Sequence, residues 1–190
     1  MNNSPALLLI DVQQGFEHPK WGARNNHGAE ANMARLLAAW RDAGRPVFHV
    51  KHNSRSPQAP LHPANPGNAI KPLVAPRSGE PVFEKSVNSA FIGTTLEASL
   101  RAAGVTSLVI VGLTTPHCVS TTTRMAANLG FAVQLVADAT AAYEWTAHDG
   151  RKLPPEEVHY HALAALHGEF ADVVQTDAVL ASLPRAVATK

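Results

Sequence analysis

The sequence predicts an α/β protein with a parallel sheet that is covered by helices on both faces. Short apolar runs alternate with segments of helical period along the chain, and this alternation is typical of parallel sheets. The 190 residues contain no internal repeat and no linker-like stretch, so we expect a single domain over residues 1–190. The composition agrees with a packed core, because 45% of the residues are hydrophobic and 16% are charged.

The first half of the chain predicts three strands, one helix and one long loop. The strands are short and apolar, and we expect them at residues 6–12, 46–50 and 81–83. The helix spans residues 32–44, where one face carries Met33, Leu36, Leu37 and Trp40. Residues 53–79 are rich in Pro, Ser, Asn and Gly with little periodicity, which predicts a loop. A loop of this length is usually functional, as a lid or as a contact between subunits.

The second half continues the alternation of strands and helices. We expect strands at residues 107–111, 131–137 and 171–174. Helices are expected at residues 94–104, 118–129 and 156–168. Asp177 is expected to cap a final helix. Residues 144–155 are polar and loop-like, so they could overhang a site at the sheet edge or reach a neighbouring subunit.

Charge and cysteine content exclude several classes of protein. The formal net charge is +1, which gives no general attraction to nucleic acid or to an anionic membrane. Cys118 is the only cysteine, so no disulfide can form within the chain, in keeping with a reducing cytosol. No apolar run is long enough to cross a bilayer, and the N-terminal run ends at Asp11, too short for a signal peptide. We therefore expect a cytoplasmic protein without nucleic-acid or membrane partners.

Three chemically competent side chains lie at the ends of predicted strands. Asp11, Lys85 and Cys118 come at or after the ends of the first, third and fourth strands. In open parallel sheets ligands bind beyond the carboxyl ends of the strands, so these side chains can meet at one edge. Each also has a purely structural interpretation: a carboxylate that accepts backbone hydrogen bonds, a surface lysine, or an inert buried thiol.

As a set, the three residues suit catalysis by a cysteine nucleophile. Cys118 begins a predicted helix, whose dipole favours a thiolate, and the Lys85 ammonium would favour it further. The Asp11 carboxylate disfavours a second negative charge, but it can take the thiol proton and later deliver it to a leaving amine. The three groups would titrate as one coupled unit.

Three segments resemble the motifs of isochorismatase-like cysteine hydrolases. They are residues 8–13 around Asp11, residues 83–91 around Lys85 and residues 111–130 around Cys118. The sequence Val-Ala-Asp-Ala at residues 136–139 is also similar to that family. The motifs occur in the family's order, and the resemblance runs from residue 6 to about residue 174.

The resemblance implies a three-layer α/β/α, Rossmann-like fold with a six-stranded parallel sheet. It implies a catalytic triad of Asp11, Lys85 and Cys118, and cleavage of a small amide-type substrate through a Cys118 thioester. It also implies a cis peptide bond between Leu113 and Thr114, with the backbone N–H groups of Thr114 and Cys118 as an oxyanion hole. By resemblance we expect a homo-oligomer, a dimer or a tetramer, and no cofactor.

A metal site was considered at the histidines His49, His52 and His62. Nicotinamidases of this superfamily bind a metal through an Asp-x-His pair and a further histidine. Here Val50 stands two positions before His52, and no aspartate occurs in residues 43–137. We interpret His52 as a hydrogen-bonding residue at a strand end and His62 as a loop residue, and we predict no metal. This departure argues against nicotinamidase activity.

Several side chains near the strand ends are candidates for substrate binding, because aromatic rings there could sandwich a planar substrate. These candidates are Phe16, Trp21, Asn88, Phe91, His117, Tyr143 and Trp145. Core packing is the alternative, most of all for Phe91 and Tyr143. Trp21 and Trp145 fall in loop-like segments, where a large apolar side chain needs a partner, either the substrate or a second subunit.

Other functions remain open at this point. A vinyl-ether hydrolase would use Asp11 as its acid and would not need the cysteine. A non-catalytic small-molecule-binding protein could use the same fold, although it would not need the three residues together. A thiol redox sensor is disfavoured, because there is no second cysteine to resolve a disulfide within the chain.

Overall fold

A computed structural model describes residues 4–183 of the chain. Six parallel strands form one sheet in the order β3-β2-β1-β4-β5-β8. The strands are β1 (Ala6–Ile10), β2 (Val47–His52), β3 (Val82–Lys85), β4 (Ser107–Leu113), β5 (Ala132–Ala141) and β8 (Asp172–Val174). The predicted α/β class and the six-stranded parallel sheet are therefore confirmed.

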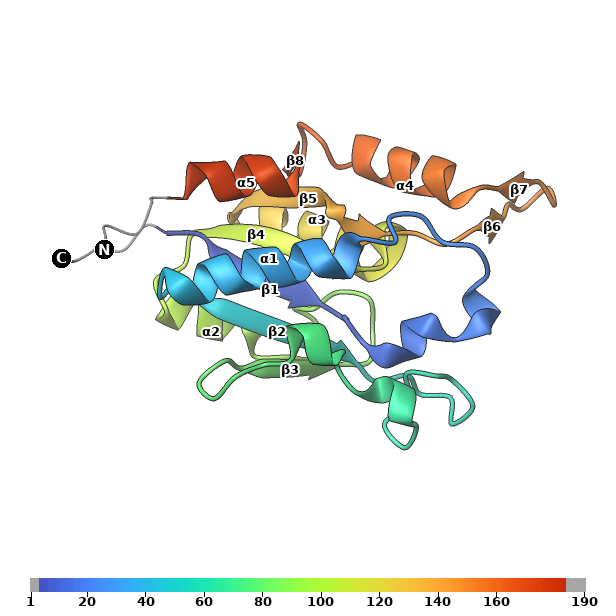
Figure 1. Cartoon of the computed structure of the whole chain (residues 1–190), viewed down its shortest axis with the longest axis horizontal. Helices are drawn as coiled ribbons and strands as arrows, with labels where there is room; N and C mark the ends of the chain where they lie inside the picture. Colours follow the sequence, from blue (N-terminus) through green and yellow to red (C-terminus); the bar gives the residue numbers. More distant parts are fainter. Residues whose placement is uncertain (1–3, 184–190) are drawn as a thin grey trace.

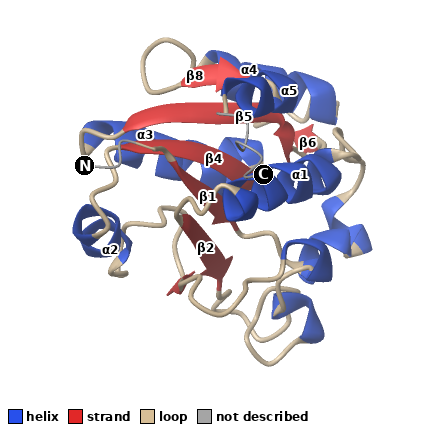
Figure 2. Cartoon of the chain, turned by 60° about the vertical axis from the view of Figure 1, so that its left-hand side comes forward, coloured by secondary structure: helices blue, strands red, loops and turns tan. Residues whose placement is uncertain are grey.

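Helices cover both faces of the sheet (Figures 1 and 2). One face carries α1 (Ala29–Asp42) and α5 (Thr176–Ser182), and the other carries α2 (Leu96–Ala102) and α3 (Ser120–Asn128). A further helix, α4 (Pro155–Ala164), packs on the turn that leads into α3. Among residues 4–183, no helix has the length and apolar character needed to cross a membrane.

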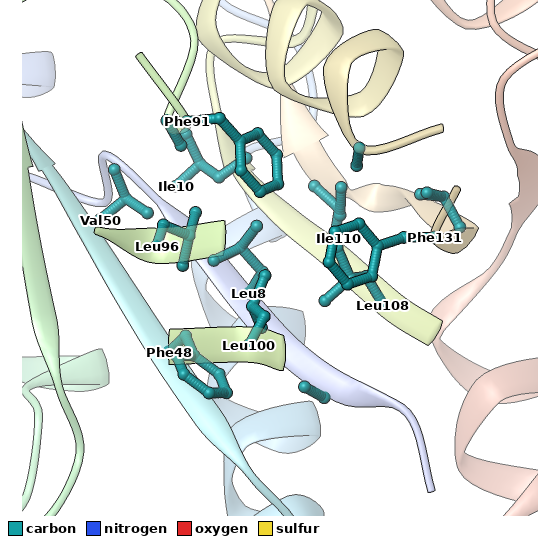
Figure 3. Close-up of a cluster of buried hydrophobic side chains, with 14 of the residues drawn as sticks. Leu8, Ile10, Phe48, Val50, Phe91, Leu96, Leu100, Leu108, Ile110 and Phe131 are labelled. Carbon is teal, nitrogen blue, oxygen red and sulfur yellow. The ribbon is translucent and has the colours of Figure 1, made fainter. Parts of the chain in front are cut away.

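Two hydrophobic clusters, one on each face of the sheet, follow from the alternation of side chains along each strand. Leu8, Ile10, Leu108 and Ile110 point to the face of α2 and α3, where they pack with Leu96 (Figure 3). The residues between them on β1 and β4 point to α1, in a second cluster. Because both sets are buried, the strands read as continuous apolar runs, which is why the sequence predicted them.

Several boundaries differ from the sequence-based expectations. Asp177 does not cap the last helix; the Asp138 carboxylate does so, accepting the Thr176 N–H at 2.8 Å. The predicted helix at residues 118–129 begins instead as a π-helical turn, η5 (Thr115–Val119), which then continues as α3. The expected loop at residues 144–155 contains a small hairpin of β6 (Trp145–Thr146) and β7 (Lys152–Leu153).

Short 3-10 turns interrupt the segments that were expected to be loops. The long segment at residues 53–79 contains η3 (Pro66–Asn68) and η4 (Pro72–Val74). Two more, η1 (Gln14–Glu17) and η2 (Pro19–Trp21), follow β1. Proline at the first position of three of these turns fixes their start, since its φ angle suits a helical turn. The turns η1 and η2 lie with the β6–β7 hairpin beyond the carboxyl ends of the strands (Figure 1), whereas η4 packs on α1.

Gly112 lets β4 approach β1 next to the candidate site, and its replacement provides a test of the fold. It pairs with Ile10, adopts a φ angle of +134°, and a Cβ there would overlap backbone atoms of Ile10. We expect Gly112→Ala to lower the free energy of unfolding by about 3 kcal/mol or more, measured by denaturant unfolding.

Gly104→Ala is the matched control for this substitution. Gly104 also has a positive φ angle, +69°, but an added Cβ meets nothing within 4 Å. Gly104→Ala should therefore lower the free energy of unfolding only by the cost of the backbone conformation, about 1–2 kcal/mol. Equal losses in both variants would contradict the importance of the close approach between β4 and β1.

Candidate active site

The candidate site lies where the strand order reverses. β1 and β4 are neighbours at the centre of the sheet, and the chain continues outward in opposite directions from them. A crevice at such a switch point is the usual ligand site of open α/β sheets. Asp11 directly follows β1, and Cys118 lies in η5, directly after β4. Lys85 is the last residue of β3, two strands away from β1.

Asp11 is held in an unusual backbone conformation at the end of β1. Its φ angle is +53°, a left-handed value that non-glycine residues seldom adopt and that is often found at functional sites. Its N–H donates to the Val50 carbonyl at 2.9 Å. The residue is fully buried, and one carboxylate oxygen, Oδ2, accepts a hydrogen bond from the Lys85 ammonium at 2.6 Å. Within residues 4–183, the other oxygen, Oδ1, has no hydrogen-bond partner.

Lys85 reaches Asp11 by crossing the intervening strand. Strands are spaced about 4.8 Å apart, so a side chain from β3 must extend over β2 to reach the end of β1. His52 pairs with Lys85 in the β2–β3 register, and its Nδ1 lies 3.0 Å from Lys85 Nζ. The Lys85 side chain has no exposed surface, so its ammonium is fixed by these partners rather than by water.

Cys118 completes the cluster. A carboxylate oxygen of Asp11, a ring nitrogen of His52 and the Cys118 sulfur all lie within 4.8 Å of one another. Burial, and next the negative charge of Asp11, raise the pKa of the Cys118 thiol to about 12, while the Lys85 ammonium acts to lower it. Burial also raises the pKa of Asp11 against the opposing effect of Lys85.

These pKa shifts show which of the opposing effects on the thiol is larger. Burial and the Asp11 charge, which disfavour a thiolate, outweigh the Lys85 ammonium, which favours it. The resting sulfur is therefore a neutral thiol. Because burial makes Asp11 more basic, and because Oδ1 has no hydrogen-bond partner among residues 4–183, the carboxylate is suited to take the thiol proton as the sulfur attacks.

The raised thiol pKa predicts a steep pH dependence of alkylation. With a pKa of about 12, the reactive thiolate fraction should grow about tenfold per pH unit from neutral pH upward. The second-order rate of iodoacetamide labelling of Cys118, followed by intact mass, should rise accordingly without a plateau in the neutral range. The unfolded protein serves as the control, since its thiol should level off near an ordinary pKa of roughly 8.5. A plateau in the folded protein below that pH would contradict the raised pKa.

The residues expected to form the oxyanion hole lie beside the sulfur in sequence and structure. The peptide bond between Leu113 and Thr114 is cis. Thr114 is buried, and its hydroxyl lies 3.2 Å from His117 Nδ1. The exposed His117 ring packs on the Trp145 ring, with centroids 5.1 Å apart. This chain of contacts links the β6–β7 hairpin to η5.

Three other candidates for substrate binding pack mainly on one another. The Phe16, Trp21 and Tyr143 rings form a cluster with centroid distances of 5.3 to 6.4 Å. Trp21 Nε1 donates to the Gly15 carbonyl at 2.8 Å, and the Tyr143 hydroxyl donates to the Phe16 carbonyl at 2.6 Å. Trp21, which was expected to need substrate or a second subunit as its partner, thus has partners within the chain.

The last two candidates have different surroundings. Phe91 stacks on Phe131 in the core at 6.1 Å, which fits the alternative of core packing. Asn88 is exposed, and its carbonyl accepts a hydrogen bond from the Thr122 hydroxyl. A role in substrate binding stays a prediction for all seven side chains.

The three histidines considered for a metal site do not converge. His49 contacts Glu80 at 3.0 Å, and His62 Nδ1 accepts the Ala64 N–H. His52 instead belongs to the cluster with Asp11 and Cys118, whose donor types could bind a metal ion. The Lys85 ammonium already bridges Asp11 and His52, so a cation bound there would have to displace it.

Comparison with known proteins identifies the family. The sequence model of the isochorismatase domain matches residues 5–178. The chain belongs to the isochorismatase family. It is similar to the isochorismatase family protein YrdC of Bacillus subtilis, with 46% identity over 180 residues, 95% of this chain and 96% of YrdC. It is also similar to the crystal structure of an isochorismatase-family protein of Chromobacterium violaceum, with a TM-score of 0.91 and 48% identity over 94% of this chain and 92% of that one. Maleamate amidohydrolase of Pseudomonas putida is 33% identical over 150 residues, 70% of each chain.

Two polar residues of this isochorismatase-family site were not recognised as such from sequence. His52 was interpreted as a strand-end hydrogen-bonding residue, which it is, but its partner is Lys85. Gln13 supports it: Gln13 Oε1 accepts the His52 N–H at 2.8 Å, and its Nε2 donates to the His52 carbonyl at 3.0 Å. Gln13 is fully buried, and its place in the motif at residues 8–13 is the sequence signal that could have drawn attention to it.

Proposed function

We propose that this isochorismatase-family protein is a cysteine hydrolase that cleaves the C–N bond of a small amide-type substrate. Asp11, Lys85 and Cys118 are its catalytic residues. The observation that carries the proposal is the difference between the two carboxylate oxygens of Asp11. Lys85 donates to Oδ2, whereas Oδ1 has no hydrogen-bond partner in the described part of the chain and belongs to a cluster that includes the sulfur. The relatives named maleamate amidohydrolase, streptothricin hydrolase and nicotinamidase support hydrolysis, and two of these names support an amide bond.

In the first half of the proposed reaction, the acyl group of the substrate is transferred to Cys118. Asp11 takes the proton of the Cys118 thiol while the sulfur attacks the carbonyl carbon and forms an S–C bond. The backbone N–H groups of Thr114 and Cys118 hold the developing oxyanion. Asp11 then gives its proton to the leaving nitrogen, the C–N bond breaks, and the amine departs. The acyl group remains on Cys118 as a thioester.

The second half uses water to restore the enzyme. Asp11 takes a proton from a water molecule, whose oxygen attacks the thioester carbon. The C–S bond breaks, the carboxylic acid leaves, and the thiolate receives the proton from Asp11. Throughout, the Lys85 ammonium neutralises whichever of Asp11 and Cys118 is negatively charged, so one buried positive charge serves both states.

The proposal is tested by a screen for ammonia release over small primary amides, ureas and carbamoyl compounds. We expect at least one compound to be hydrolysed by the wild-type protein, with its acyl group detected on Cys118 by mass spectrometry of quenched reactions. Hydrolysis that proceeds undiminished after complete alkylation of Cys118 would overturn the proposal. That result would favour the alternative in which Asp11 alone acts as an acid, as in a vinyl-ether hydrolase.

A further inference from the structure

His52 occupies a position in the cluster that the proposed mechanism does not use. We infer that His52 is a positioning residue: its Nδ1 accepts a hydrogen bond from the Lys85 ammonium, and this contact directs another N–H bond of the ammonium at Cys118. The inference rests on the proposed function in one respect, because it takes Cys118 as the reacting thiol.

The geometry of an ammonium group gives this contact its consequence. The Lys85 nitrogen carries its side-chain carbon and three protons at the corners of a tetrahedron. One proton is bound by Asp11 Oδ2 at 2.6 Å, and a second faces His52 Nδ1 at 3.0 Å. The carbon and these two protons fix three corners of the tetrahedron, so the direction of the remaining proton is fixed as well. The Cys118 sulfur lies within 4.8 Å of a carboxylate oxygen of Asp11 and of a ring nitrogen of His52, and the Lys85 ammonium acts to lower the pKa of its thiol, so we assign the sulfur as the partner of this remaining proton.

His52 is itself held rigidly enough to serve as a fixed acceptor. It ends β2, directly beside Lys85 in the register of β2 and β3. Gln13 binds both its backbone N–H and its carbonyl, and Asn68 Nδ2 donates to the same carbonyl at 3.1 Å. The strand therefore cannot fray at the point where the imidazole meets the lysine side chain.

The imidazole must be neutral for this role, since a protonated ring has no free acceptor. Burial and the positive charge of Lys85 lower the pKa of His52, and these effects exceed the opposing effect of Asp11. Lys85, Asp11 and Cys118 are the titratable groups that face the ring, from β3, the end of β1 and η5 respectively. With Nδ1 accepting from the ammonium, the single ring proton resides on Nε2.

Two substitutions separate the acceptor from the bulk of the ring. His52→Leu keeps a side chain of similar size but removes the acceptor, whereas His52→Asn places a carbonyl oxygen close to the position of Nδ1. We expect His52→Leu to slow iodoacetamide alkylation of Cys118 by about 10- to 100-fold at a fixed pH below the thiol pKa, because the ammonium stabilises the thiolate less well. His52→Asn should stay within a few-fold of the wild type.

His49→Leu is the matched control. His49 lies on the same strand and also forms one hydrogen bond through its ring, but its partner is Glu80, outside the cluster. It should leave the alkylation rate unchanged, with thermal unfolding used to show that all three variants are folded. An unchanged rate in His52→Leu would overturn the inference. Equal slowing in His52→Leu and His52→Asn would also overturn it, because the ring's bulk rather than its acceptor would then matter.

Alkylation requires no substrate, so this test fails independently of the proposed function. If the alkylation rates follow the expected order but no amide is hydrolysed, the positioning role stands and the proposed reaction does not. Once a substrate is known, His52→Leu should show its loss in kcat with little change in KM, since His52 is argued to act on the reacting sulfur through Lys85.

Discussion

Replacing Cys118 with alanine should abolish hydrolysis of any substrate found for this protein, with kcat/KM falling on the order of 10⁴-fold or more. The variant lacks the sulfur that we propose forms the thioester, and Asp11 and Lys85 cannot replace it as a nucleophile because they are paired with each other. Kinetic assays of ammonia release would measure the loss. Mass spectrometry should detect an acyl adduct on the wild-type protein and none on the variant.

The interpretation of this variant depends on an intact fold, which the structure favours. Cys118 is only 8% exposed and lies in a hydrophobic cluster, where alanine is a smaller but compatible side chain. We therefore expect thermal unfolding close to that of the wild type. Cys118→Ser provides a further control, since it keeps the volume and a weaker nucleophile. Undiminished turnover by Cys118→Ala would rule out covalent catalysis.

The sequence predicted the fold and the approximate place of the site for simple physical reasons. Strands buried on both faces appear as continuous apolar runs, and β1 and β4 were recognisable for this reason. The residues that follow parallel strands gather at one edge, so the approach of Asp11 and Cys118 could be expected without coordinates. The small hairpin was missed, because its strands have two residues each and carry no periodicity.

The electrostatics of the site depend on features that sequence spacing does not contain. The order of the strands places β2 between β3 and β1, and only this order brings His52 into contact with the crossing Lys85 side chain. Burial has the largest effect on the pKa of the Cys118 thiol, and the spacing of residues along the sequence does not give the extent of burial. The partners of Trp21 were likewise unpredictable, because they come from a 3-10 turn and from the segment that follows β5.

Asp11→Asn should have opposite effects on turnover and on the acidity of the thiol. An amide cannot take or deliver the proton, so we expect kcat to fall by about 10²- to 10⁴-fold. The same substitution removes the negative charge that raises the pKa of Cys118, while the Lys85 ammonium remains. The pKa of the thiol should therefore fall below its wild-type value of about 12, and the midpoint of the pH profile of iodoacetamide alkylation should move to lower pH.

A fall in kcat together with a fall in the pKa of the thiol distinguishes a proton-transfer role of Asp11 from a structural one. If Asp11 only stabilised the fold, its replacement would change turnover and alkylation only to the extent that it lowered the free energy of unfolding. Asp138→Asn is the matched control, because the Asp138 carboxylate caps α5 through Thr176 and lies outside the cluster. That variant should lower the unfolding temperature without moving the alkylation midpoint.

In Asp11→Asn the amide oxygen can still accept from Lys85, so a folded but inactive protein with a more acidic thiol is the expected result. A midpoint that stays in place, or moves to higher pH, would contradict the assignment of Asp11 as the base, because the carboxylate would then exert no charge effect on the sulfur it is proposed to deprotonate.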